Sequence, residues 1–194
     1  MSKTEFKTRK EDHEIDSQFL QRWSPRSFVK DHYLSVDDLK RMVAAARWSP
    51  SCFNEQPWHF YFGMKPNQSF NDFLSVLVEK NQMWAQNTSA IGLVTASKSF
   101  KKNGKPNSWA EFDTGAAWMS LALQALKMDL HCHAMAGFEA DKAYELLGLS
   151  KDEHAIICAI AIGKAGSPND LPEGFGVFEA PNERAPIEES ITIK

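Results

Sequence analysis

Two arginines that flank a serine, in the run Arg22-Trp23-Ser24-Pro25-Arg26, are the first residues whose spacing suggests binding chemistry. In an extended backbone, side chains two positions apart point to the same side, so one hydroxyl and two guanidiniums would face one way. Charge-assisted donors of this kind suit a phosphate dianion. A solvated basic turn is the alternative, and for this segment taken alone it is the better interpretation.

A second candidate is the polar, turn-rich segment 49–58 (SPSCFNEQPW), which separates an expected helix from an expected strand. Its small hydroxyls and side-chain amides could hydrogen-bond the edge of a flat heterocycle. A plain helix-to-strand loop explains the segment equally well. A third candidate is 135–138 (MAGF), where a glycine after a short strand would let backbone amides approach a ligand.

A metal site and the common nucleotide-binding loops are not expected. His131 and His133 flank Cys132 and would share a face of a strand, but no second group of ligands lies nearby. No Gly-x-Gly-x-x-Gly follows a strand and no Gly-x-x-x-x-Gly-Lys-Ser/Thr is present, which argues against a Rossmann or P-loop domain.

The composition is that of one globular domain. The 194 residues are 43% hydrophobic and 24% charged, with a net charge of −3, so no basic footprint for nucleic acid is present. No apolar run is long enough for a membrane span, and the charged N-terminus does not resemble a secretory signal. Three sparse cysteines, Cys52, Cys132 and Cys158, favour a reducing compartment, so we expect a cytoplasmic protein.

Hydrophobic periodicity predicts alternating helices and strands that end in a tail. Ser35 and Asp38 form an expected capping box at the start of the second helix, and Gly148 is expected to stop the last one. Helices are expected over 12–23, 35–48, 70–77, 110–128 and 141–147, and strands over 58–64, 90–96, 131–135 and 154–163. This order predicts a mixed α+β or three-layer arrangement.

Two features point to an oligomer. The middle of the helix 110–128 is apolar nearly all round, with Phe112, Ala116, Met119, Leu123 and Leu126 on one stripe. Such a helix is typical of a large core or of a subunit interface, and a chain of this size favours a dimer interface. From Ala165 onward the chain is rich in proline and lacks a core of its own, so this tail is either disordered or wrapped around a partner.

Together these segments resemble the nitroreductase family of FMN-dependent oxidoreductases. The Arg-x-Ser-x-Arg run matches the family's phosphate- and ribityl-binding stretch, and SPSCFNEQPWHF resembles its most discriminating motif, S-P-S-x-x-N-x-Q-P-W-x-F. FDTGAAWMSLALQA is similar to the family's central dimer helix, and HAMAGFEAD to the loop that meets the flavin ring. Arg184 matches a C-terminal basic residue that reaches the phosphate, and the resemblance covers roughly residues 15–190.

The resemblance implies a single domain over 1–194 with a three-layer α/β/α nitroreductase-like fold and a mixed central sheet. It implies a homodimer with FMN at the subunit interface and a C-terminal tail exchanged between subunits. Residues 1–12 would then be a flexible N-terminus, and 165–194 an extension that packs on the partner.

The resemblance also assigns residues to the cofactor. Arg22, Ser24 and Arg184 would hold the phosphate, and Arg26 would stabilise the negative charge that reduction places on the flavin's pyrimidine edge. The backbone N–H of Ala136 or Gly137 would donate to flavin N5, which does the chemistry. The complete expected cofactor set is Arg22, Trp23, Ser24, Arg26, Pro50, Ser51, Cys52, Asn54, Gln56, Asn81, Met135, Ala136, Gly137 and Arg184, of which Pro50, Ser51, Cys52 and Asn54 would come from the partner.

The implied activity is hydride transfer from NAD(P)H through FMN to nitroaromatic, quinone or similar acceptors by a ping-pong mechanism. The chain departs from the family pattern at Ala136, where many members carry an acid, at Trp84, where many carry Lys, and at Asn182 and Glu183, where a basic residue is common. A flavin-binding protein of the same fold with different flavin chemistry, or without efficient NAD(P)H turnover, is the alternative. Lys101, Lys102 and Lys105 are the candidates for reading a nicotinamide 2′-phosphate.

Overall fold

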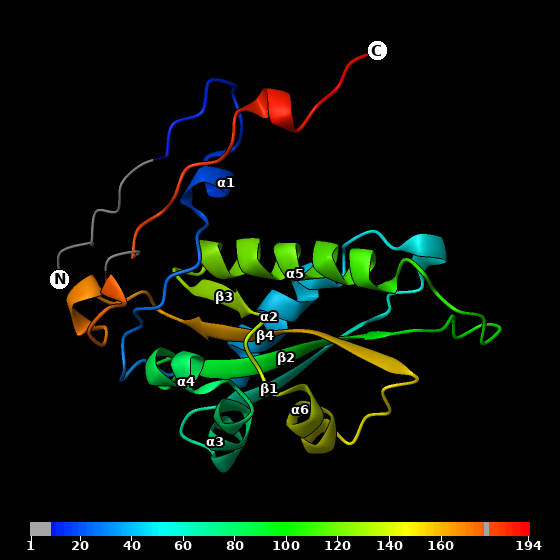
Figure 1. Ribbon diagram of the computed structural model, residues 1–194, viewed down its shortest axis with the longest axis horizontal. Helices are drawn as coiled ribbons and strands as arrows, with labels where there is room; N and C mark the ends of the chain where they lie inside the picture. The colour runs from blue at the N-terminus through cyan, green and yellow to red at the C-terminus, as the bar shows by residue number, and fades with distance from the viewer. Residues whose placement is uncertain (1–8, 177–178) are drawn as a thin grey trace.

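The computed structural model describes residues 9–176 and 179–194, and a four-stranded sheet lies at its centre (Figure 1). The strands are β1 (Trp58–Met64), β2 (Ala90–Ser97), β3 (His131–Met135) and β4 (His154–Gly163), in the order β1-β2-β4-β3. Every neighbouring pair is antiparallel. The expected mixed sheet is therefore wrong for the described part of one chain, because each strand returns against the direction of its neighbour.

Helices cover both faces of the sheet and give the expected three layers. The helices α2 (Val36–Ala46) and α5 (Ala110–Lys127) lie on one face. The helices α3 (Gln68–Ser75), α4 (Glu79–Ala85) and α6 (Ala140–Leu147) lie on the other (Figure 1). A hydrophobic core lies on each face of the sheet, and alternate residues of β4 belong to one or the other. Ile160 and Ile162 face α5, whereas Ala159 and Ala161 face the opposite layer.

Local sequence signals explain where the helices begin and end. The hydroxyl of Ser35 accepts from the backbone N–H of Asp38 at 3.1 Å, and the Asp38 carboxylate accepts from the Ser35 N–H at 2.9 Å, which confirms the capping box. Gly148 ends α6 in the left-handed conformation. The first helix is shorter than expected: α1 spans only Ser17–Gln21, because Asp16 caps its start and the backbone is extended again at Arg22.

The helix α4 was not expected from the sequence. Only Trp84 and Ala85 of its seven residues are buried, so its apolar pattern is too brief to show a helical period. It nevertheless positions Asn81 and Trp84 beside β3, because Asn81 bonds to the backbone of Gly137 and the Trp84 ring packs on His133.

The long helix α5 buries only one side within its own chain. Ala117, Leu121 and Ala125 lie in the core, whereas Phe112 is 75% exposed and Gly115 is exposed. Met119, Leu123 and Leu126 of the expected stripe are only half-buried. These half-buried and exposed residues give α5 an outward apolar face, and α1 packs against part of the outer side of this helix (Figure 1).

The C-terminal tail leaves the body of the domain beside the N-terminal segment (Figure 1). Glu179 and Pro181 are buried, but residues 182–194 are exposed, including Ile187, Ile191 and Ile193. The last residues, 190–194 (SITIK), have a strand-like composition but form no strand in the structure. Of the N-terminal segment expected to be flexible, residues 1–8 lie outside the described residues. In the described ranges, no helix is both long and apolar enough to cross a membrane.

Candidate functional site

Four arginines meet at one cavity of about 440 Å³ beside the start of β3. Helix α1 ends at Gln21, and the extended backbone that follows turns Arg22, Ser24 and Arg26 toward this cavity, as their spacing predicted. Arg22 Nη1 lies 3.4 Å from the Ser24 hydroxyl. The cavity is lined by Arg9, Arg22, Trp23, Ser24, Arg26, His133, Ala180, Asn182 and Arg184. The structure thus brings Arg184 to the Arg-x-Ser-x-Arg run from the far end of the chain.

A buried glutamate fixes the backbone that carries Arg26. One carboxylate oxygen of Glu179, a residue only 6% exposed, accepts from the backbone N–H groups of Arg26 and Ser27, both at 2.8 Å. The Ser27 carbonyl accepts from the N–H of Gly166 at 2.9 Å. A side chain at Gly166 would meet the Ser27 hydroxyl at 2.8 Å, so only glycine allows this close approach. The loop is therefore held from two segments distant in sequence.

The electrostatics of the cavity favour an anion. Burial, and then the charge of Arg184, lower the pKa of Arg22. Burial, Arg184 and Arg22, in that order, lower the pKa of Arg9. Like charges held together in this way repel one another, and a bound anion with several oxygen acceptors would relieve that repulsion. Among the described lining residues there is no Asp or Glu.

Arg9 is a member of this cluster that the sequence analysis missed. It is 7% exposed, and it donates to three backbone carbonyls: Asn182 at 2.8 Å, Arg22 at 2.8 Å and Leu20 at 3.2 Å. The Leu20 and Arg22 carbonyls lie at the C-terminal end of α1, where helix carbonyls lack intrahelical partners. No local pattern marks Arg9, because its partners are distant in the sequence.

His133 is the second residue of the cavity that the sequence analysis did not assign. Its Nδ1 lies 2.8 Å from the Pro25 carbonyl, and its ring packs on Trp84 at 4.8 Å. Burial, the first cause, and the charge of Arg26 lower its pKa. Its strand neighbour Cys132 packs in the core on the opposite face, where burial raises the thiol pKa to about 12. No cluster of metal-ligand type occurs among the described residues.

Asn81 and Gly137, two expected cofactor residues, contact each other. Asn81 Nδ2 donates to the Gly137 carbonyl at 2.9 Å, and Val78 N–H donates to the same oxygen at 3.2 Å. A side chain at position 137 would meet Asn81 Nδ2 at 2.6 Å, which explains the glycine. Ala136 is exposed and Met135 is buried. This contact and the packing of Trp84 on His133 together hold α4 against β3 and the residues that follow it.

Trp84 stands where the resemblance leads us to expect a lysine, and the structure shows what its indole contacts. The indole is 1% exposed and lies between the rings of Phe28, at 6.2 Å, and His133, at 4.8 Å. It therefore acts as a packing residue behind His133 and not as a further cation.

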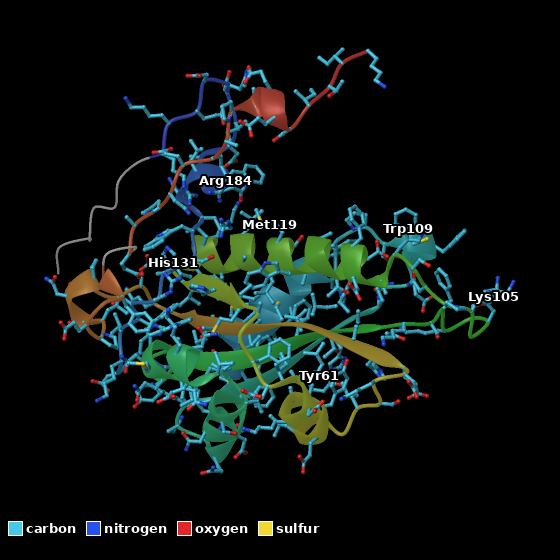
Figure 2. All side chains as sticks on the ribbon, viewed as in Figure 1. Tyr61, Lys105, Trp109, Met119, His131 and Arg184 are labelled. Carbon is cyan, nitrogen blue, oxygen red and sulfur yellow. The ribbon has the colours of Figure 1, made fainter. Side chains whose placement is uncertain are left out.

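The segment with Pro50, Ser51, Cys52, Asn54 and Gln56 lies elsewhere in the chain. Its short 3-10 helix (Cys52–Asn54) is tied to the start of α5, because Cys52 N–H donates to Asp113 at 3.0 Å. The arginine cavity lies near the other end of α5, where Figure 2 labels His131 and Arg184, opposite Trp109. An 18-residue helix is roughly 27 Å long, so one chain does not bring the two halves of the expected site together.

The fold and these motifs agree with three comparisons. The model of the Nitroreductase family matches residues 19–164. The crystal structure of an FMN-containing oxidoreductase superposes with a TM-score of 0.90 at 33% identity, covering 95% of this chain and 93% of that one. Protein DrgA of Synechocystis is 29% identical, over 79% of this chain and 90% of that protein. An oxygen-insensitive NADPH nitroreductase of Helicobacter acinonychis is 26% identical, over 74% and 84% of the two chains.

Proposed function

This chain belongs to the nitroreductase family, and we propose that it works as a homodimeric, FMN-dependent oxidoreductase. The observation that carries the proposal is the convergence of Arg9, Arg22, Arg26 and Arg184 on one cavity. The FMN found in the 33% identical structure supports the choice of cofactor. All three cysteines are free thiols, which is compatible with the cytoplasmic location expected from the sequence.

The lining residues fit the phosphate end of FMN. Arg22, Ser24 and Arg184 supply charge-assisted and hydroxyl donors, which are what a phosphate monoester requires. Arg26 is fixed by Glu179 through its backbone, which leaves its side chain to face the cavity. We assign Arg26 to the pyrimidine edge of the isoalloxazine ring, where a cation stabilises the negative charge that reduction creates.

The second half of the site is proposed to come from the other subunit. A two-fold axis near Met119, in the middle of the outward face of α5, would pair two α5 helices antiparallel (Figure 2). The segment 50–56 of one chain would then lie beside the arginine cavity of the other. This arrangement also covers Phe112 and Gly115, which are exposed in the single chain.

The tail is proposed to bind the partner. An apolar groove of about 420 Å³ runs between α2 and the edge strand β1 and carries Lys40 and Arg47 on its rim. The tail offers Ile187, Ile191 and Ile193, all exposed, together with Glu188 and Glu189. Apolar and charge complementarity therefore favour the tail of a second copy as the occupant of this groove.

When bound, FMN would supply the hydride chemistry, accepting hydride from NAD(P)H and passing it to a nitroaromatic, quinone or similar acceptor in two successive half-reactions. The protein's part is binding and orientation. Asn81 holds the Gly137 carbonyl beside the exposed Ala136, and we assign the N–H groups of these two residues to flavin N5. Arg26 would make the reduced cofactor easier to form.

The proposed function and its alternative differ in whether NAD(P)H is an efficient electron donor. Ala136 is exposed and cannot orient a nicotinamide through a charge, which favours a flavin protein with little NAD(P)H turnover. Against this, the basic loop with Lys101, Lys102 and Lys105 adjoins the segment 50–56, because Lys101 N–H donates to Glu55 at 2.8 Å. We assign this loop to a nicotinamide 2′-phosphate, which makes NADPH the preferred donor.

Anaerobic reduction of the FMN-loaded protein tests the proposal. The purified protein, supplied with FMN and then freed of unbound FMN by gel filtration, should show the flavin absorption bands, and NADPH should bleach them faster than NADH. Reoxidation by a quinone should then restore the bands. Absence of the bands after gel filtration would exclude FMN binding, and a stable flavin spectrum with both nucleotides would favour the alternative.

A further inference from the structure

His133 differs in chemistry from the cations around it. The arginine side chains that line the cavity can only donate hydrogen bonds, because a guanidinium has no acceptor. The Pro25 carbonyl, 2.8 Å from His133 Nδ1, can only accept. Nδ1 therefore carries the hydrogen, and the neutral ring has its lone pair on Nε2.

The neutral form of His133 is the one present near neutral pH. Burial and the positive charge of Arg26 lower the pKa of the ring, and they outweigh the carbonyls of Pro25 and Ser24, which act in the opposite direction. Trp84 packs against the ring and brings no charge. His133 is thus an acceptor in a cavity that is lined by four cationic donors and, besides them, by the polar side chains of Ser24 and Asn182.

We propose that His133 is a cofactor-binding residue whose Nε2 accepts a hydrogen bond from a hydroxyl group next to the bound phosphate. The inference rests on the proposed function, in which that hydroxyl belongs to the ribityl chain of FMN. The phosphate of a monoester is mainly a dianion near neutral pH, so its oxygens are acceptors that match the arginines and leave Nε2 without a donor. A ligand that fills both sets of groups is a phosphate monoester of a polyol and not a bare anion.

The orientation of the ring is fixed by its neighbours, which makes the contact specific. The strand β3 places His133 at the cavity, Pro25 holds Nδ1, and Trp84 supports one side of the ring. Pro25 lies between Ser24 and Arg26, so the hydrogen bond joins the acceptor to the same loop that carries the phosphate donors. The strand β3 and the loop 22–26, which this hydrogen bond joins, would therefore bind a polyol phosphate together.

Three ligands measured on the full-length protein freed of bound nucleotide test this proposal: FMN, ribitol 5-phosphate and sulfate, an oxyanion that carries no proton near neutral pH. His133→Leu should weaken FMN and ribitol 5-phosphate binding by roughly fivefold to tenfold, the effect of one hydrogen bond. It should leave the affinity for sulfate unchanged. His133→Gln, which keeps an acceptor oxygen, should recover part of the loss, and Arg22→Ala should weaken all three ligands.

The outcomes distinguish a direct contact of His133 with the ligand hydroxyl from a purely structural role, and both from the proposed function. An equal loss for sulfate in His133→Leu would show that the residue only supports the loop through Pro25, which would overturn the proposal. Unchanged affinity for all three ligands would also overturn it while leaving FMN binding intact. If ribitol 5-phosphate depends on His133 but the wild-type protein does not bind FMN, the proposed function is wrong and the hydroxyl contact stands.

Discussion

Arg9 Nε donates a 2.8 Å hydrogen bond to the backbone carbonyl of Asn182, across 173 positions of sequence. The same guanidinium holds the end of α1 through the carbonyls of Leu20 and Arg22. The two ends of the chain are thereby joined at the arginine cavity. Arg22 and Arg184 lie on the two segments that Arg9 joins, so Arg9 acts as a positioning residue for both.

Replacing Arg9 should therefore weaken anion binding through geometry as well as charge. We expect Arg9→Ala to reduce FMN affinity by at least tenfold, because the variant loses one cation and loosens the segment that carries Arg184. Arg9→Lys should recover less than half of this loss in free energy, because one ammonium cannot reproduce a planar fork that reaches three carbonyls. Titration of flavin fluorescence measures both, with the exposed neighbour Lys10→Ala as the control. Full rescue by lysine would assign Arg9 a role through charge alone.

Arg22 tests the phosphate assignment directly. Arg22→Ala should weaken FMN binding by on the order of 2 kcal/mol, or tens-fold, because it removes a charge-assisted contact. Riboflavin, which lacks the phosphate, should lose little affinity in the same variant. Arg41→Ala is the matched control, since Arg41 is an exposed arginine on α2 that lines neither the cavity nor the groove proposed for the tail. Equal losses for FMN and riboflavin would place Arg22 away from the phosphate.

Gly115 tests the proposed interface without threatening the fold. A side chain there meets nothing within 4 Å in the single chain, and arginine has a higher helix propensity than glycine. Gly115→Arg should therefore fold but sediment as a monomer with little bound FMN. Glu145→Arg, exposed on α6 in the opposite layer, should remain dimeric. A dimeric Gly115→Arg protein would exclude the α5 pairing.

The buried histidines predict a loss of stability in acid. Burial lowers the pKa of His131 and of His133, so in the window below about pH 6.5 the unfolded chain binds more protons than the folded one. The free energy of unfolding should therefore fall as the pH drops from 7 toward 5, by at most ~1.4 kcal/mol per pH unit for each histidine. Urea titrations at both pH values should show a smaller fall in His131→Phe than in wild type. The exposed His13→Gln variant should keep the full dependence.

Three of the strands could be predicted from the sequence because each is a compact apolar or aromatic run, whereas 131–135 (HCHAM) is short and carries two histidines. The expected strands over 58–64, 131–135 and 154–163 have the bounds found in the structure, and the buried run 90–96 is extended only by Ser97. The capping box at Ser35 and the stop at Gly148 are also local signals, and both are confirmed. In β4, successive side chains point to opposite faces of the sheet. The sequence of this one strand is therefore enough to predict which of its residues face each layer.

The parts that could not be predicted depend on contacts between distant segments. Arg9 has no motif around it and becomes a site residue only through Asn182. His133 resembled a metal ligand because of its spacing from His131, whereas the structure assigns it to the loop at Pro25. The segment 50–56 was recognised as polar and turn-rich, but its place relative to the arginines depends on a second chain. Its partner contacts therefore remain a prediction.

The FMN content of a purified mixed dimer tests the central claim most directly. One chain would carry Arg22→Glu, and the other Asn54→Gly with Gln56→Gly, which removes two side-chain amides at positions where φ is positive and glycine is tolerated. If each site combines the arginines of one subunit with the 50–56 segment of the other, neither homodimer should bind FMN, while the mixed dimer should hold one FMN per two chains. Flavin bound at full occupancy by the Asn54→Gly, Gln56→Gly homodimer, or a mixed dimer without flavin, would contradict a site shared between two subunits.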